Sequence, residues 1–98
     1  MTTPLHDERL DTVVSALLAS GATRVLDLGC GPGELLLRLR SHAQFVRLLG
    51  IDIDERALAD ARFALGLDWL RPDPRLAVRL GSFEEVDREL VGFDAAVM

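Results

Sequence analysis

A glycine-rich segment between two apolar stretches constrains this 98-residue chain more than any other feature. It reads Gly29-Cys30-Gly31-Pro32-Gly33, directly after the short apolar run of residues 24–28. The leucines that follow Glu34 have the spacing of a helix packed on a sheet. Glycines at such a turn allow tight backbone geometry and let a ligand approach the main chain without a Cβ in the way. The sequence therefore predicts a strand, a ligand-binding loop and a helix in succession.

The rest of the chain alternates between helical and strand-like patterns. Thr3 and Pro4 suit the start of a first helix, and Asp54 suits the cap of a third. We expect helices over residues 4–20, over about 34–41 and after Asp54, strands over 24–28, 45–52, 76–80 and 93–98, and a short helix or irregular turn over 83–90. Alternation of this kind, with connections long enough for crossovers, predicts an α/β fold with about four mainly parallel strands and flanking helices.

The charge balance and the single cysteine exclude several classes of protein. The chain has 16 acidic residues and 11 basic ones, a net charge of −5, and all the basic residues are arginine. An acidic chain without a basic run is a poor general nucleic-acid platform, although a few arginines can still hold a nucleic-acid substrate. One cysteine cannot form an internal disulfide, so we expect a reducing, cytoplasmic location. No apolar run approaches the length of a membrane span.

Two aspartates near the glycines indicate which nucleoside ligand the loop takes. Asp52 ends the second predicted strand, where a carboxylate can accept both hydroxyls of a ribose. Asp27 precedes the first glycine and suits an ammonium group, whereas Glu34 would repel a pyrophosphate at the helix start. A ligand with adenosine at one end and a cationic amino acid at the other, S-adenosylmethionine, fits this arrangement. An NAD-dependent oxidoreductase is disfavoured by Asp27 and by the glycine spacing.

Less specific interpretations of these residues remain open at this point. The loop can be a glycine-rich turn without a ligand, and Asp52 a solvated aspartate at a strand end. We expect Asp54 to cap a helix rather than bind ribose. We expect Cys30 to present its amide, and not its thiol, to the ligand, because no basic partner for a thiolate is indicated.

Residues 24–33 resemble the first motif of the class I S-adenosylmethionine-dependent methyltransferases, and residues 49–54 resemble the second. The resemblance implies a Rossmann-like sheet. It also implies that Asp27 and the glycines hold the methionine end, Asp52 the ribose, and Ile53 the adenine. Ser82 stands where many members carry an aspartate that contacts the base. The cofactor-binding residues that we expect are Asp27, Gly29, Cys30, Gly31, Gly33, Asp52, Ile53, Ser82 and Phe83.

A narrower resemblance runs through residues 5–14, 67–70, 81–83 and 92–96, which are similar to HEN-type small-RNA 2′-O-methyltransferases of the bacterial RNA-repair branch. It implies methylation of the 2′-hydroxyl of the 3′-terminal nucleotide, beside a kinase–phosphatase–ligase repair partner. That family uses a divalent metal held by a Glu-x-x-Glu-His motif after the fourth strand and by a later histidine. The motif is absent from the sequence, and we expect His6 and His42 to be surface residues.

We therefore expect residues 1–98 to be the cofactor-binding, N-terminal part of a single methyltransferase domain. No catalytic or metal-binding residue is predicted within them, and we expect the catalytic residues beyond Met98. Two alternatives stay open. One is a methyltransferase with a small-molecule or protein substrate, and the other is a truncated, non-catalytic cofactor-binding module.

Overall fold

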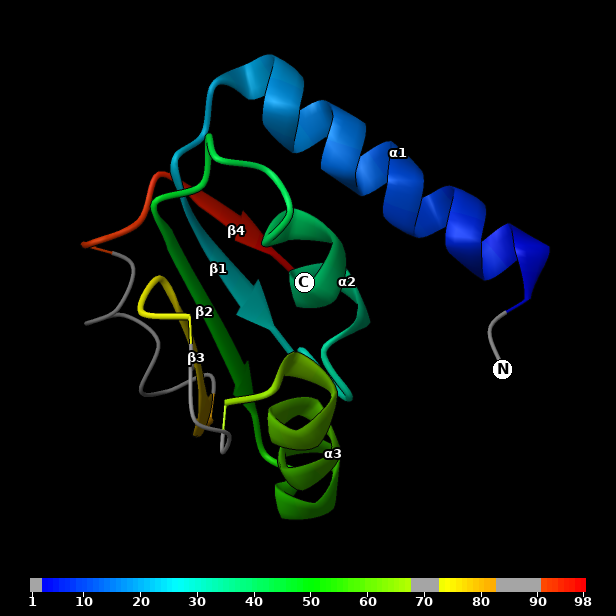
Figure 1. The fold of residues 1–98 in the computed structure, drawn as a ribbon, viewed down its shortest axis with the longest axis vertical. Coiled ribbons are helices and arrows are strands. Elements are labelled where there is room, and N and C mark those ends of the chain that lie inside the picture. The colour runs from blue at the N-terminus through cyan, green and yellow to red at the C-terminus, as the bar shows by residue number, and fades with distance from the viewer. Residues whose placement is uncertain (1–2, 68–72, 83–90) are drawn as a thin grey trace.

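The computed structural model of the chain describes residues 3–67, 73–82 and 91–98. Within them the elements follow the predicted alternation of helix and strand (Figure 1). They are α1 (Pro4–Ser20), β1 (Arg24–Leu28), α2 (Glu34–Leu39), β2 (Arg47–Asp52), α3 (Glu55–Leu65), β3 (Leu76–Leu80) and β4 (Ala95–Val97). The short helix or turn predicted over residues 83–90 lies outside the described residues.

The described strands form one parallel sheet in the order β3-β2-β1-β4. The chain runs outward from β1 through β2 to β3, and then returns to pair β4 with the free side of β1. This reversal of direction places a topological switch point at the carboxyl ends of β1 and β4. Open parallel sheets bind their ligands at such a point. The predicted mainly parallel α/β fold is confirmed.

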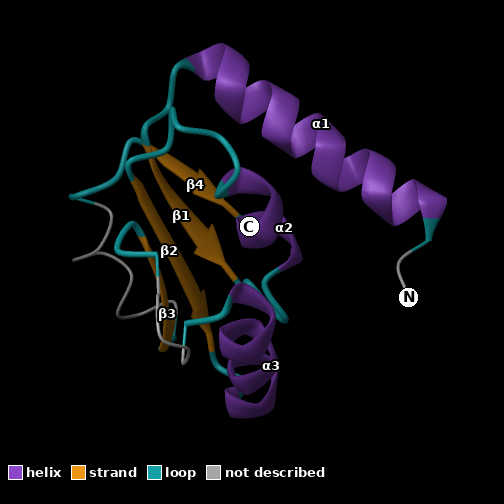
Figure 2. Cartoon of the chain, in the orientation of Figure 1, coloured by secondary structure: helices purple, strands orange, loops and turns teal. Residues whose placement is uncertain are grey.

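The three helices cover one face of the sheet (Figure 2). Strand residues with side chains on that face, such as Val25 and Leu48, are fully buried with Leu36 and Leu39 of α2. Leu26 and the other alternate residues of β1 and β2 form a second buried cluster. Side chains alternate along a strand, so Asp27 shares the helix-covered face with Val25.

Short-range polar contacts explain where the helices begin and end. The Thr3 hydroxyl accepts a hydrogen bond from the His6 amide at 3.1 Å, and the Asp54 carboxylate caps α3 in the same way. Gly21 ends α1 in a left-handed conformation with φ of 76°. The Gln44 side-chain amide donates to carbonyl oxygens at the end of α1. The caps predicted at Thr3 and Asp54 are confirmed.

The predicted second helix and second strand are each longer than the observed element. Helix α2 ends at Leu39, because the chain turns back and the Ser41 hydroxyl donates to the Arg38 carbonyl. Strand β2 begins at Arg47 rather than at residue 45. Phe45 is instead a fully buried core residue in the preceding turn. Apolar character alone does not separate a buried turn residue from the first residue of a strand.

Strand β4 begins at Ala95, later than predicted. Asp94, which precedes it, binds the residues at the amino end of β1. Its carboxylate accepts hydrogen bonds from the Thr23 amide and hydroxyl and from the Arg24 amide, at 3.0–3.2 Å. The bond from the Arg24 amide, followed by that from the Thr23 amide, lowers the pKa of Asp94. Asp94 therefore lies at the end of the sheet opposite to the glycine loop.

Candidate functional site

The glycine loop turns sharply at the carboxyl end of β1 and is open on its outer side. Gly29 and Gly31 have φ of 74° and 54°, in the left-handed region that favours glycine. A Cβ added at either residue would meet nothing within 4 Å. The Gly29 amide donates to the Ile51 carbonyl at 2.7 Å, which ties the loop to β2. The loop is thus fixed from behind and leaves its outer side accessible to a ligand.

Two further glycines serve packing rather than ligand access. A Cβ on Gly33 would lie 3.1 Å from a Leu65 methyl carbon and 3.3 Å from the Ala61 Cβ, so Gly33 brings the start of α2 close to α3. A Cβ on Gly50 would lie 2.8 Å from the Cys30 sulfur and 2.7 Å from a Leu36 methyl carbon. No local signal in the sequence indicates this role of Gly50, because the glycine lies inside strand β2 with no turn beside it.

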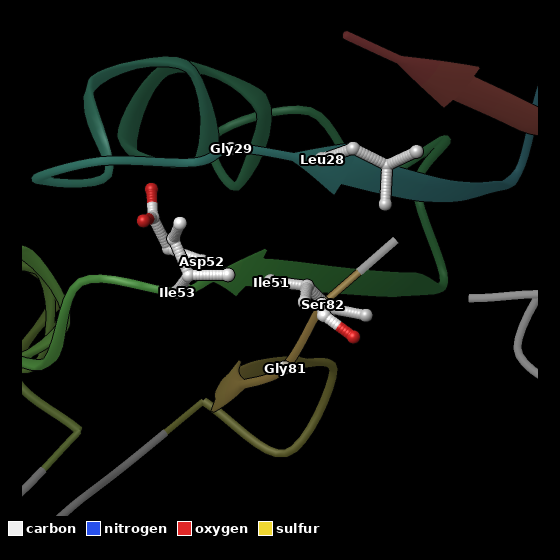
Figure 3. Close-up of a pocket in the computed structure, with 7 residues that line it drawn as sticks. All are labelled: Leu28, Gly29, Ile51, Asp52, Ile53, Gly81 and Ser82. Carbon is white, nitrogen blue, oxygen red and sulfur yellow. The ribbon is translucent and has the colours of Figure 1, made fainter. Parts of the chain in front are cut away.

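Asp52 connects the end of β2 to the glycine loop. Its Oδ2 accepts a hydrogen bond from the Gly31 amide at 2.8 Å, and its Oδ1 accepts one from the Asp54 amide at 2.9 Å. Figure 3 shows the carboxylate rising from the end of β2 toward the loop. A carboxylate can accept about four hydrogen bonds, so two amide donors leave acceptor capacity for a ligand.

Asp27 is a buried carboxyl group beside the loop. Its residue is 6% exposed, and no hydrogen bond to its side chain is found among the described residues. Burial, followed by the negative charge of Asp52, raises the pKa of Asp27 from 3.8 to about 7. A buried carboxylate with an unfavourable environment is a strong binding partner for a cationic ligand group that can neutralise it.

Two hollows among the described residues share Gly29 in their lining. The first is lined by Leu28, Gly29, Ile51, Asp52, Ile53, Gly81 and Ser82 (Figure 3). The second, about 370 Å³, is lined by His6, Asp27, Glu34 and Met98 among others, and it shares Leu28 and Gly29 with the first. An extended ligand that crosses Gly29 would therefore contact Asp52 on one side and reach Asp27 on the other.

Two of the residues predicted to contact an adenine, Ile53 and Ser82, line the first hollow. Ile53 follows Asp52 and is 74% exposed, so it offers an apolar surface at the rim. Gly81 donates its amide to the Asp52 carbonyl at 3.0 Å, which places Ser82 beside the end of β2. Phe83 lies outside the described residues. The contacts of Ile53, Ser82 and Phe83 with a base stay predictions.

Cys30 differs from the sequence-based expectation in one respect. Its amide, which we expected to face a ligand, donates to the Ile51 carbonyl at 3.1 Å. The residue is 7% exposed, with its sulfur against Gly50. Burial, and then the charges of Asp27 and Asp52, raise the pKa of the thiol to about 12. Cys30 therefore shapes the loop by packing, and its thiol is poorly reactive.

His6 is a surface residue, as the sequence predicts, with its side chain 46% exposed, and it also lines the second hollow. Its Nε2 lies 2.7 Å from Glu34 Oε2, and both residues line the second hollow. The two are 28 positions apart, and the docking of α1 against α2 brings them together. No local pattern could have revealed this contact. His42 lies elsewhere, with its ring edge-to-face against Phe45.

Two kinds of feature are absent from residues 3–67, 73–82 and 91–98. No three His, Cys, Asp or Glu side chains in these ranges are grouped so that they could hold a metal ion. None of the helices there has both the length and the apolar character that a membrane-spanning segment requires.

A parallel sheet with a glycine loop at its switch point, and with an aspartate at the end of the neighbouring strand, defines a Rossmann-like fold. Comparison with known proteins identifies the family within that class. The methyltransferase domain family matches residues 19–97. The chain belongs to this family, and the resemblance found in its sequence motifs is confirmed.

Individual relatives are similar over most of the chain. The small RNA 2′-O-methyltransferase of Xenopus tropicalis is 35% identical over 97 residues, which are 93% of this chain and 26% of that protein. The methyltransferase domain of bacterial CtHen1 is 35% identical with a TM-score of 0.85, over 94% of this chain and 49% of that one. The N-methyltransferase NodS from Bradyrhizobium japonicum, solved with S-adenosyl-L-homocysteine, has a TM-score of 0.66 at 25% identity, over 82% of this chain and 38% of that one.

The chain covers only part of the length of these relatives. It spans about a quarter of the length of the Xenopus relative and about half of the CtHen1 domain. The matched part contains the glycine loop, Asp52 and the four described strands.

Proposed function

We propose that this chain binds S-adenosylmethionine, and that residues 1–98 form the cofactor-binding part of a methyltransferase domain. The observation that carries the proposal is the pair of hollows joined at Gly29, with Asp52 in one and Asp27 in the other. One carboxylate suits a ribose diol and the other suits an ammonium group, as a nucleoside joined to an amino acid requires. When bound, S-adenosylmethionine supplies a methyl group activated by its positive sulfur.

The residues present fit this cofactor. Gly29 and Gly31 lack the Cβ atoms that would fill the space above the loop. Asp52 has acceptor capacity for the ribose hydroxyls, and Ile53 offers an exposed apolar side chain to the adenine. Asp27 is a buried carboxyl group whose charge an ammonium would compensate. The similarity to NodS, which was solved with S-adenosyl-L-homocysteine, supports the same assignment.

The substrate that we propose is the 2′-hydroxyl of the 3′-terminal nucleotide of an RNA. Support comes from the similarity to small RNA 2′-O-methyltransferases and to the CtHen1 domain. Resemblance to that family further suggests a divalent metal bound outside residues 1–98, a kinase–phosphatase–ligase repair partner, and a cytoplasmic location. The free, buried thiol of Cys30 is compatible with a reducing compartment.

Isothermal titration calorimetry with S-adenosylhomocysteine tests the cofactor assignment. Asp52→Ala should weaken binding about 10–100-fold, because charge-assisted hydrogen bonds to the ribose are lost. Asp60→Ala, an exposed aspartate on α3, is the matched control and should leave the affinity unchanged. An unchanged affinity in the Asp52 variant, or displacement of the ligand by NADH at similar concentration, would refute the assignment.

The RNA substrate requires a separate test. We would sequence the source transcript through and beyond the codon for Met98. A Glu-x-x-Glu-His motif shortly after that codon, with another histidine downstream, supports methylation of RNA ends. A reading frame that continues without the motif, or that stops there, contradicts catalysis of this reaction by the encoded chain.

A further inference from the structure

The second hollow has an uneven distribution of charge. Two of its lining residues, Asp27 and Glu34, carry carboxyl groups. His6 is the one described lining residue whose side chain can become a cation. Its other described lining residues are apolar side chains, glycines, Pro32 and the neutral, buried Cys30. Among the described lining residues, His6 is therefore the side chain that can supply a positive partner to an anionic group in this hollow.

The amino-acid end of the proposed cofactor brings such an anionic group. It carries an ammonium and a carboxylate on the same carbon. Asp27, buried and negatively charged once ionised, suits the ammonium. The carboxylate would meet repulsion from Asp27 and Glu34 unless a hydrogen-bond donor with positive charge compensates it. The loop amides of Gly29, Cys30 and Gly31 are not available to it, because they already donate to Ile51 and Asp52.

His6 is held in place for this role by contacts between α1 and α2. Its Nε2 is 2.7 Å from Glu34 Oε2, while no hydrogen bond involves its Nδ1 among the described residues. One turn away, Arg38 of α2 contacts Asp7 at 2.9 Å and Asp11 at 3.4 Å. These ion pairs hold the amino-terminal half of α1 against α2. A protonated imidazole donates from both nitrogens, so Nε2 can stay with Glu34 while Nδ1 serves a second carboxylate.

We infer that His6 binds the carboxylate at the amino-acid end of the cofactor and that Glu34 acts as its positioning residue. The inference rests on the proposed binding of S-adenosylmethionine. It gives α1 a direct role in binding the cofactor, in addition to its packing on α2. It also accounts for an acidic residue at the start of α2, directly after the glycine loop.

The test compares two ligands that differ only in the carboxylate. S-adenosylhomocysteine carries it, and the decarboxylated analogue S-adenosyl-3-thiopropylamine keeps the adenosine, sulfur and ammonium. Calorimetry at pH 7 measures the affinity of each for the wild-type chain and for His6→Gln. We expect His6→Gln to weaken S-adenosylhomocysteine about 5–20-fold, as for a partly exposed charge-assisted hydrogen bond, and to leave the affinity of the amine unchanged.

Three controls make the outcome specific. His42→Gln, at the other histidine, should change neither affinity. Glu34→Gln should weaken S-adenosylhomocysteine alone, and should cause no further weakening in the His6→Gln background if Glu34 acts through His6. Thermal unfolding of each variant verifies that the fold persists, since the backbone contact between the His6 amide and Thr3 is retained.

The possible results separate this inference from the proposal on which it rests. If the wild-type chain binds neither ligand, the proposed function itself fails. If it binds both, and His6→Gln weakens both equally or neither, cofactor binding stands and the role of His6 is overturned. Loss of affinity for S-adenosylhomocysteine alone supports the inference.

Discussion

The buried charge of Asp27 lowers the stability of the unliganded fold, and the same charge is proposed to bind the ammonium of the cofactor. The variant Asp27→Asn removes the charge, so that its effects on stability and on binding can be measured separately. The raised pKa means that the folded chain holds a proton at Asp27 more tightly than the unfolded chain does. The free energy of unfolding therefore decreases as the pH rises from 3.8 to about 7, and stays reduced above that range. Asparagine has the same shape without the charge, so the variant should be more stable than the wild type at alkaline pH.

The size of the effect follows from the pKa. A rise from 3.8 to about 7 corresponds to about 4 kcal/mol when Asp27 is fully ionised, at 1.4 kcal/mol per pKa unit. Relaxation and water entry around the carboxylate reduce this figure in a folded protein. We expect Asp27→Asn to gain about 1–3 kcal/mol at pH 8, or about 5–15 °C in Tm, and to gain nothing measurable at pH 4.

Two measurements on the same variant complete this prediction. Thermal unfolding followed by circular dichroism at pH 4 and pH 8 gives the stability difference, and Asp60→Asn, an exposed control, should show no gain at pH 8. Calorimetry should show at least about tenfold weaker binding of S-adenosylhomocysteine, because the partner of its ammonium is lost. An Asp27→Asn variant that is less stable at pH 8, or that binds like the wild type, would refute the reasoning.

Three further predictions concern the loop and its surroundings. In the His6→Gln background, affinity for S-adenosylhomocysteine should fall about 5–10-fold from pH 8 to pH 6, because protonation of Asp27, with a pKa of about 7, removes its charge; a flat calorimetric profile would contradict this. Gly33→Ala should lower the free energy of unfolding by about 2–4 kcal/mol. The reason is that an alanine there would have a strained positive φ and its Cβ would press against α3. Gly21→Ala has a similar φ in open space and should cost only about 1 kcal/mol in the same denaturant titration. Cys30 should react with a thiol reagent at pH 8 only after unfolding, since its pKa is about 12; rapid modification of the native chain would disprove its burial.

Local signals explain why most of the fold could be predicted from the sequence. Thr3 and Asp54 cap helices through contacts only two or three residues away. The alternation of residues 76–80 and the apolar run of residues 24–28 each indicate a strand without reference to the rest of the chain. The sequence does not define where the second strand begins, because Phe45 is buried in a turn just as it would be in a strand.

The parts of the site that could not be predicted depend on contacts between distant elements. His6 reaches the glycine loop only because α1 docks on α2. The need for glycine at position 50 depends on Cys30 and Leu36, which pack over it from another element. The sequence predicts that the Cys30 amide faces a ligand, because it does not show that this amide lies within hydrogen-bond distance of the Ile51 carbonyl. Each case requires a three-dimensional neighbour that no pattern along the chain contains.

The central claim is that one ligand crosses Gly29 and occupies both hollows. Amide chemical-shift mapping of the ¹⁵N-labelled chain during titration with S-adenosylhomocysteine tests it most directly. The account predicts concerted shifts at Gly29 and Gly31, at Ile53 and Ser82 of the first hollow, and at His6 and Asp27, which line the second. Shifts confined to one hollow, or no shifts at a ligand concentration of several millimolar, would contradict the account.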